Sequence, residues 1–359
     1  MFHGRERALL GRGGASYGQH ARALQGAGHG RLLRRGDSDS LTASRGPLLQ
    51  RLEITNYRSI AKADVALRPF TILVGANGSG KSNLLKLLRD LSLNNSLTKH
   101  LGLPTTPTRI QITSTLGSFF RTDDQNKKAP ELNGVRVFSI DPIPVGSSEP
   151  LGSTPEVQPN GAGAVQVLDS LKTGDREDLF DKIEAQLREF VPEIEKLSFI
   201  PGVNAKRLQV RERGIPTPVP VSELSEGTRL VLTILTIVHQ ERKPSIICLE
   251  DIDRGLHPAL FGKVVEVCRA LTRGEGAPQI IATTHNPYFV DQFVDDEDSV
   301  LLVEKTNANT TFTPLSARLA ELGERTETLG GVWYSGLVGA TPKTDLKHLP
   351  TLADPPAGD

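Results

Sequence analysis

The chain has 359 residues, enough for a large α/β domain with a buried core. Its 42 lysines and arginines balance 42 aspartates and glutamates. This balance excludes a global basic field that would hold the protein on nucleic acid or an anionic membrane, although a local basic face is compatible with it. The most apolar stretch, Leu230 to Val238, is shorter than the about 20 residues of a membrane span, so we expect no membrane insertion. Cys248 and Cys268 form neither a metal-ligand spacing nor a disulfide framework, which predicts a cytoplasmic protein.

Residues 1–47 differ in composition from the rest of the chain. Arginines stand among glycines, lysine is absent, and no apolar periodicity is sustained, so we expect disorder. The composition favours an over-long gene prediction with initiation near Leu48. A transit peptide and a basic nucleic-acid-binding arm are the alternatives. At the other end, we expect residues 346–359 to form a flexible tail.

In the first half of the ordered region, apolar patterning predicts several strands and two helices. Alternation predicts a strand over Arg51–Thr55, and the apolar run Phe70–Val74 predicts a second. A helix should follow Lys81, with Leu84, Leu87, Leu88 and Leu91 on one face. Further on, short strands are expected over residues 109–113 and 135–140. Another amphipathic helix should bury Leu179, Ile183, Leu187, Phe190 and Val191.

The second half alternates buried strands with helices. Residues 225–240 predict a helix that is apolar nearly all round, and residues 245–249 predict a short buried strand. Pro258 fits the first position of the next helix, and residues 279–283 predict another buried strand. This alternation is typical of an α/β fold with a parallel or mixed sheet covered by helices on both faces.

The strongest functional pattern is Gly75-Ala-Asn-Gly-Ser-Gly-Lys-Ser82, which fits the phosphate-binding loop Gly-x4-Gly-Lys-Ser. It lies between a predicted strand and a predicted helix, as such a loop requires. Backbone N–H groups and the helix N-terminus favour phosphate, Lys81 should reach the β- and γ-phosphates, and the Ser82 hydroxyl should bind Mg²⁺. The expected ATP ligands are Asn77, Gly78, Ser79, Gly80, Lys81, Ser82 and Asn83.

Two acidic residues end the strand at residues 245–249, as in a Walker B element. This pattern predicts that Glu250 lies on the Mg²⁺ side and that Asp251 activates the attacking water. The competing register makes Asp251 the Mg²⁺-side acid and gives the role of general base to Glu250 or Asp253.

Two further motifs lie next to predicted buried elements, one at the start of a helix and one at the end of a strand. Ser225-Glu-Gly-Thr228 opens a buried helix, where a Ser and a Gly can form an anion site; a plain N-cap is the alternative. His285 follows a buried strand, where an imidazole can contact a γ-phosphate, although a lone histidine is more often structural.

Taken in this order, the motifs resemble the ABC-type ATPase heads of the RecF/SMC group. Ser225, Glu226 and Gly227 resemble their signature motif, and His285 their switch histidine. Gly255-Leu-His-Pro258 resembles the segment that follows Walker B in AAA-family ATPases related to the OLD proteins. The resemblance implies a P-loop NTPase head over residues 48–345, with an antiparallel β lobe and an inserted β/α lobe over residues 100–222.

The same resemblance extends to both ends of the predicted head. Ile54-Thr-Asn-Tyr-Arg-Ser-Ile60 resembles the opening strand of the group, which implies that Arg58 reaches the nucleotide. Leu329–Gly336 resembles the C-terminal part of small bacterial ATPases of this kind. The spacing leaves no room for the coiled-coil arm of SMC proteins between Lys81 and Ser225, or for a Toprim nuclease after His285.

The resemblance implies an ATPase that uses Mg²⁺ and forms an ATP-dependent homodimer, with Ser225 acting in the partner's site. We expect slow hydrolysis, because Asp251 stands where a glutamate is usual. The output is expected to involve DNA or a partner effector such as a nuclease. The alternatives are the ATP-binding subunit of a membrane transporter and a non-hydrolysing regulator. No glutamine can be assigned to the Q-loop, for which Gln111 and Gln125 are candidates.

Overall fold

The computed structural model of the chain describes residues 49–93, 97, 106–115, 117–122, 134–141, 145, 149–150, 156–201, 205–274, 276–323 and 328–341. The segments 1–47 and 346–359, for which we predicted disorder and flexibility, lie outside these ranges, as does the candidate Gln125. The predicted boundaries of the head therefore stay predictions.

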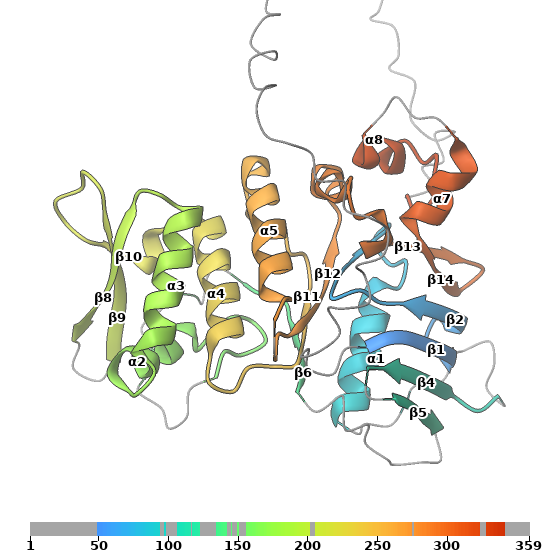
Figure 1. Cartoon of the computed structure of the whole chain (residues 1–359), viewed down its shortest axis with the longest axis horizontal. Coiled ribbons are helices and arrows are strands. Elements are labelled where there is room, and N and C mark those ends of the chain that lie inside the picture. The colour runs from blue at the N-terminus through green and yellow to red at the C-terminus, as the bar shows by residue number, and fades with distance from the viewer. Residues whose placement is uncertain are drawn as a thin grey trace, which may run out of the picture. The chain divides into compact units, whose positions relative to one another are not determined.

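A mixed sheet with the strand order β14-β13-β3-β12-β11-β6 lies at the centre of the fold (Figure 1). Its neighbouring strands are parallel except for the antiparallel pair β13–β14. The strands are β3 (Phe70–Val74), β6 (Val135–Phe138), β11 (Ile246–Leu249), β12 (Gln279–Thr284), β13 (Val300–Thr306) and β14 (Asn309–Pro314). This arrangement confirms the predicted α/β class.

Both faces of this sheet are buried, which explains why its strands are apolar without interruption. Along β3, Ile72 and Val74 belong to one hydrophobic cluster, and Leu73 between them belongs to the other. Because side chains alternate along a strand, an uninterrupted apolar run supplies a core on each side.

One face of the sheet is covered by helix α1 (Lys81–Leu93) and, beyond it, by an antiparallel sheet of order β2-β1-β4-β5 (Figure 1). As predicted, Leu84, Leu87, Leu88 and Leu91 of α1 are buried. They pack with the inner side chains of the antiparallel sheet and with the central strands. The strands are β1 (Leu49–Tyr57), β2 (Ile60–Ala66), β4 (Arg109–Ser114) and β5 (Gly117–Thr122). The Q-loop candidate Gln111 lies in β4 of this sheet.

The other face is covered by α5 (Phe261–Leu271) and α4 (Glu226–His239), with an α/β lobe beyond them (Figure 1). The lobe contains α2 (Ala164–Thr173), α3 (Glu177–Phe190), β7 (Glu149–Pro150), β8 (Ile194–Pro201), β9 (Ala205–Glu212) and β10 (Val219–Pro220). In α3 the fully buried stripe runs through Phe180 rather than Leu179, because residues 180, 183, 187 and 190 repeat at helical spacing on the inner side.

The segment 100–222, which we expected to form one inserted lobe, is divided among three sheets. Strands β4 and β5 join the antiparallel sheet, β6 forms an edge of the central sheet, and only the residues from β7 onward build the lobe. The short helix α6 (Pro287–Val290) and two 3-10 turns connect β12 to β13, and α7 (Leu315–Leu322) and α8 (Leu329–Tyr334) follow β14.

Candidate nucleotide site

The phosphate loop connects β3 to α1, and it passes close to strands β13 and β14. A Cβ atom at Gly75 would lie 2.2 Å from the carbonyl oxygen of Val303. At Gly80, where φ is +113°, a Cβ atom would lie 2.3 Å from Thr310 Oγ1. Glycine is required at these two positions because no side chain fits between the loop and the C-terminal hairpin. The two glycines of the phosphate-loop motif are therefore explained by the close approach of the loop to β13 and β14.

Lys81 begins α1 and points back into the loop. Its Nζ atom donates hydrogen bonds to the carbonyl oxygens of Gly75 at 2.8 Å and Ala76 at 3.0 Å. Burial lowers the pKa of Lys81 to about 8, and the nearby carboxylate of Asp251 partly opposes this shift. The amine is thus held at the centre of the loop, where phosphate oxygens would stabilise its charged form.

The acidic residues after β11 lie in different surroundings. Asp251 has a left-handed backbone with φ of +51°, a conformation that is strained for a residue other than glycine. Its N–H donates to Thr283 Oγ1 at 2.9 Å, which anchors the turn to β12. The side chain is half exposed and lines the cleft beside the phosphate loop, whereas Glu250 is not among the described residues that line this cleft. Asp253 is half-buried, and burial raises the pKa of its carboxyl group.

His285 lies between Asp251 and the phosphate loop. Its Nε2 atom is 3.7 Å from Asp251 Oδ1, and its ring hydrogen-bonds to the backbone of Gly75. Burial and, to a lesser extent, the charge of Lys81 lower the pKa of His285, so the imidazole is mostly neutral near pH 7. Strands β3, β11 and β12 end side by side, and this brings Lys81, Asp251 and His285 together.

A chain of side-chain hydrogen bonds holds the phosphate loop from below. Asn83 Nδ2 donates to Ser59 Oγ at 2.6 Å, and Ser59 Oγ lies 2.7 Å from Thr310 Oγ1. Thr310 Oγ1 donates to the carbonyl oxygen of Ser79 at 2.8 Å. Since each hydroxyl has one proton, Ser59 donates to Thr310 in this chain. Asn83, which we predicted as an ATP ligand, therefore uses its side-chain amide to position the loop.

Ser59 and Thr310 were missed in the analysis of the sequence. Ser59 follows Arg58 in a motif that we noted only for its arginine. Thr310 is fully buried but lies in a polar stretch after an Asn-Ala turn, where no local pattern distinguishes it. Only its contact with a loop 231 positions earlier in the chain identifies it.

Arg58 is directed toward α1. Its Nε atom donates to the hydroxyl of Tyr57 at 2.9 Å, and that hydroxyl donates to Asp90 Oδ2 at 2.8 Å. The guanidinium lies 3.8 Å from the same carboxylate. Arg58 is not among the described residues that line the cleft, so its contact with the nucleotide stays a prediction.

The signature-like segment caps a helix away from the phosphate loop. Ser225 Oγ accepts a hydrogen bond from the N–H of Thr228 at 3.1 Å, which confirms Ser225 as the N-cap of α4. Ser225 and Glu226 are exposed, and Gly227 is buried against Gly255 and Leu256. In the described part of the chain, none of the residues 225–227 lines the cleft of the phosphate loop.

The cleft beside the phosphate loop has a volume of about 1430 Å³. Its walls are the loop residues 75–79, Asp251 and His285, the end of β13 from Val303 to Asn307, and the C-terminal part of α8 with Trp333 and Tyr334. The size suits a nucleoside triphosphate with room for further groups. The walls from β13 and α8 were not predicted from the sequence.

The donors near the loop fit Mg²⁺, which prefers oxygen ligands and takes one or two from protein carboxylates together with substrate phosphates. The Ser82 hydroxyl and the carboxylates of Glu250 and Asp251 are of this type. No preformed group of three or more His, Cys, Asp or Glu side chains suited to a metal ion occurs among the described residues. The ion would therefore be held jointly by protein and ATP.

A phosphate loop between a central parallel strand and a helix, with acidic residues after the next strand but one in the sheet, defines a P-loop nucleoside triphosphatase. Residues 48–141 match the family described as "AAA ATPase domain", and residues 163–291 match "AAA domain, putative AbiEii toxin, Type IV TA system". The Old nuclease of Escherichia phage P2 is 36% identical over 99 residues. That match covers 25% of this chain and 17% of the relative.

Solved structures of SMC heads are also similar. The SMC head bound to the C-terminal winged-helix domain of ScpA has a TM-score of 0.49 and 12% identity, and covers 74% of this chain and 97% of that chain. The head of the Pyrococcus furiosus protein, with an extended coiled coil, has a TM-score of 0.48 and 12% identity, and covers 77% of this chain and 98% of that chain.

The chain is thus a P-loop protein with the sequence pattern of AAA ATPase domains over residues 48–141 and 163–291. Both matched family models describe AAA domains, which supports ATP binding and hydrolysis by this chain. No helix in the described ranges has the length and apolar character of a membrane span.

Proposed function

We propose that the protein is an ATP-driven switch whose two copies associate head to tail around ATP. Each composite site would combine the phosphate loop of one chain with the Ser225 segment of the other. The observation that carries the proposal is the position of Ser225. It is an exposed N-cap whose helix opens toward solvent, and it does not line the cleft of its own chain. A helix N-terminus attracts anions, so a phosphate held by a second chain suits it.

Within each site, the chain's own residues would position and neutralise the phosphates. Lys81 and the loop amides offset the negative charge, and bound Mg²⁺ would supply Lewis-acid stabilisation of the transferred group. Glu250 and Ser82 would hold the metal. Asp251 would orient the attacking water, and His285, already in contact with Gly75, would meet the γ-phosphate from the opposite side.

Hydrolysis is expected to be slow. A general base must lie within about 2.6–3.2 Å of the water that it activates. Aspartate is one methylene shorter than the usual glutamate, and a displacement of about an ångström can reduce the rate on the order of 100-fold. A long-lived ATP-bound dimer suits a switch better than a pump. The same observation favours, as a second candidate, a regulator that binds ATP and dimerises without turnover.

The switch would act in the cytoplasm on DNA or on a partner effector. The matched relative is a nuclease, and a nuclease is one class of effector that such a switch could control.

Sedimentation of the Asp251→Ala variant tests the dimer. With ATP and Mg²⁺ we expect a dimer, and with ADP a monomer, because the γ-phosphate is part of the interface. Ser225→Arg should keep ATP affinity and lose the dimer, while Ser222→Arg, an exposed serine three residues earlier, serves as the matched control. A monomer with both ATP and ADP contradicts the proposed head-to-tail dimer. A dimer that forms without ATP also contradicts it. Turnover by the parent protein separates the switch from the non-hydrolysing regulator.

A further inference from the structure

The outer face of the β8–β9 pair is basic. In the register of this pair, Lys196 lies opposite Arg211, Ser198 opposite Gln209, and Ile200 opposite Arg207. The intervening residues, such as Leu197 and Leu208, point inward and are buried. The outward positions of these pairs therefore present three exposed cations, the half-buried side chains of Ser198 and Gln209, and the exposed Ile200, while the exposed Glu195 precedes Lys196 at the edge of the face.

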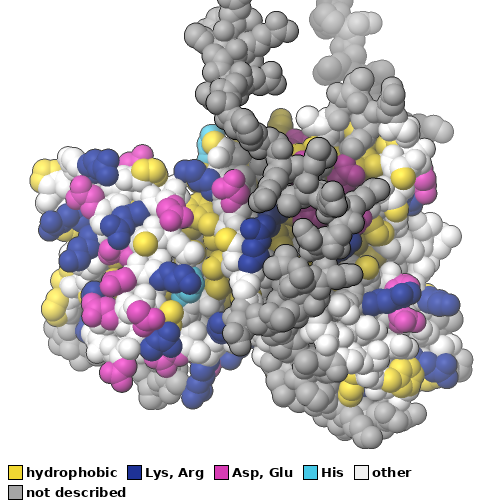
Figure 2. Space-filling model, in the orientation of Figure 1, with side chains coloured by type: hydrophobic (Ala, Val, Ile, Leu, Met, Phe, Trp, Pro, Cys, Tyr) yellow, Lys and Arg dark blue, Asp and Glu magenta, His cyan; other side chains and the backbone are white. Residues whose placement is uncertain are grey.

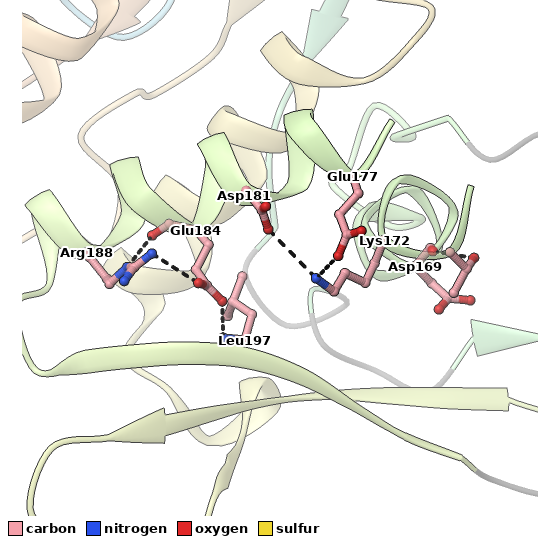
Figure 3. Close-up of polar contacts among 8 residues, drawn as sticks. Asp169, Lys172, Glu177, Asp181, Glu184, Arg188 and Leu197 are labelled. Atoms are coloured by element: carbon pink, nitrogen blue, oxygen red, sulfur yellow. Dashed lines mark hydrogen bonds and ion pairs between the residues drawn. The ribbon is translucent and has the colours of Figure 1, made fainter. Parts of the chain in front are cut away.

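Acidic residues on the helices of the lobe neutralise other cations. On α3, Glu184 accepts hydrogen bonds from Arg188 and from the backbone N–H of Leu197, while Glu177 and Asp181 face Lys172 (Figure 3). On the visible face of the lobe, acidic and basic side chains are intermingled (Figure 2).

The cations of the outer face have no such neutralisation. In the described part of the lobe, Lys196, Arg207 and Arg211 form no ion pair with a carboxylate. Glu195, which precedes Lys196 at the edge of the face, lies 3.9 Å from Arg213. Like charges directly opposite each other in a sheet are destabilising. The pair Lys196–Arg211 therefore costs stability unless a negatively charged partner covers it.

We propose that this outer face binds the phosphodiester backbone of a nucleic-acid duplex. Arginine and lysine are the main ligands of nucleic-acid phosphates, and serine and glutamine donors such as Ser198 and Gln209 supplement them. The face has no exposed aromatic ring among its described residues, so it lacks the stacking platform that single strands use. The contacts are to the backbone and carry no base specificity.

The basic face is connected to the ATP switch through a short stretch of chain, and this link rests on the proposed function. Strand β10 pairs with β9 and leads through the turn Val221–Glu223 directly to Ser225. Val221 is fully buried, so the connection is anchored in the core. A duplex that holds β9 would therefore favour one position of the Ser225 segment.

Fluorescence anisotropy of a labelled DNA duplex of mixed sequence, without nucleotide, tests the proposal on the full chain. Replacing Lys196, Arg207 and Arg211 by glutamine should weaken binding on the order of tenfold or more, and should reduce the salt slope by about 0.9 for each lost phosphate contact. The matched control replaces Lys172, Arg176 and Arg188, which removes the same charge from ion-paired positions and should leave the affinity unchanged.

Three results would overturn the proposal: no binding by the parent protein near physiological salt, equal binding by the variant, or tighter binding to phosphatidylserine vesicles than to DNA. ATP turnover without DNA is measured on the same samples, and the variant should keep it. If the parent protein lacks turnover but binds the duplex through these residues, the proposed ATP switch fails while the nucleic-acid face stands.

Discussion

The hydroxyl of Thr310 donates a hydrogen bond to the carbonyl oxygen of Ser79 at 2.8 Å, although 231 positions separate the two residues in the chain. Thr310 also accepts from Ser59, which accepts from Asn83 in α1. The C-terminal hairpin, the β1–β2 turn and helix α1 are thus joined at one point beneath the phosphate loop. The shape of the loop depends on elements from both ends of the fold.

We expect Thr310→Val to weaken ATP binding. Valine has nearly the same shape but leaves the Ser79 carbonyl without this donor and the Ser59 hydroxyl proton without an acceptor, at a cost of about 1–3 kcal/mol. The loop should therefore lose its fixed geometry, and the dissociation constant for ATP, measured by calorimetry, should rise several-fold. Thr310→Ser keeps the donor and should restore most of the affinity. If Thr310→Val lowers only the melting temperature and binds ATP as the parent does, the positioning role is wrong.

ATP affinity should fall as the pH rises above about 8. The pKa of Lys81 is about 8 in the free protein, and bound phosphates should raise it. Above about pH 8, the protein therefore takes up a proton when it binds ATP. The affinity is then full below about pH 8 and decreases by up to tenfold per pH unit until the pKa of the bound state is reached. Calorimetry between about pH 7 and pH 9.5 tests this, with Lys81→Arg as a control that stays charged. A flat profile for the parent protein contradicts the prediction.

The stability of the nucleotide-free protein should change in the opposite direction over the same range. The pKa of Lys81 falls from 10.5 to about 8 on folding, so between these values the unfolded state binds more protons than the folded state. The free energy of unfolding should therefore rise with pH through this window. Chemical denaturation of the parent protein and of Lys81→Met at two pH values isolates the contribution of this lysine.

Replacing the acidic residues after β11 should impair different steps of ATP hydrolysis. Glu250→Ala is expected to weaken the Mg²⁺ dependence of turnover, because it removes a ligand of the metal. Asp251→Ala is expected to bind ATP and trap it unhydrolysed. Asp253→Ala serves as the test of the competing register. Mg²⁺ titrations and single-turnover rates on the three variants decide the roles. If Asp251→Ala hydrolyses ATP at the parental rate, our assignment of the general base is incorrect.

Deletion of residues 1–47 should leave the ATPase intact. A segment of arginine and glycine without periodic apolar residues cannot bury enough surface to stabilise the core. We expect the parental melting temperature and turnover from the shortened chain. A large loss of either would mean that the segment docks on the ATPase, and a loss of DNA binding alone would favour a basic arm.

The local motifs and most of the central elements could be predicted from the sequence. The phosphate loop, the buried helix after Ser225 and the strands β3, β11 and β12 all have strong signals, because a loop that surrounds phosphate needs glycine and a strand covered on both faces must be apolar. The order of the motifs along the chain was also sufficient to indicate the family. These features are encoded in residues that lie near each other in the chain.

The partners of each motif were decided only by the tertiary structure. Thr310 has no local signal, since its role arises from a hydrogen bond to a loop formed much earlier in the chain. The contacts of Arg58 with Tyr57 and Asp90 are likewise visible only in the fold, and its contact with the nucleotide stays a prediction. The basic outer face exists because strand register places Lys196 beside Arg211 while the acidic residues of α3 lie on the helical side of the lobe. Composition reports only that the charges balance, whereas the field at a surface depends on which side chains folding brings together.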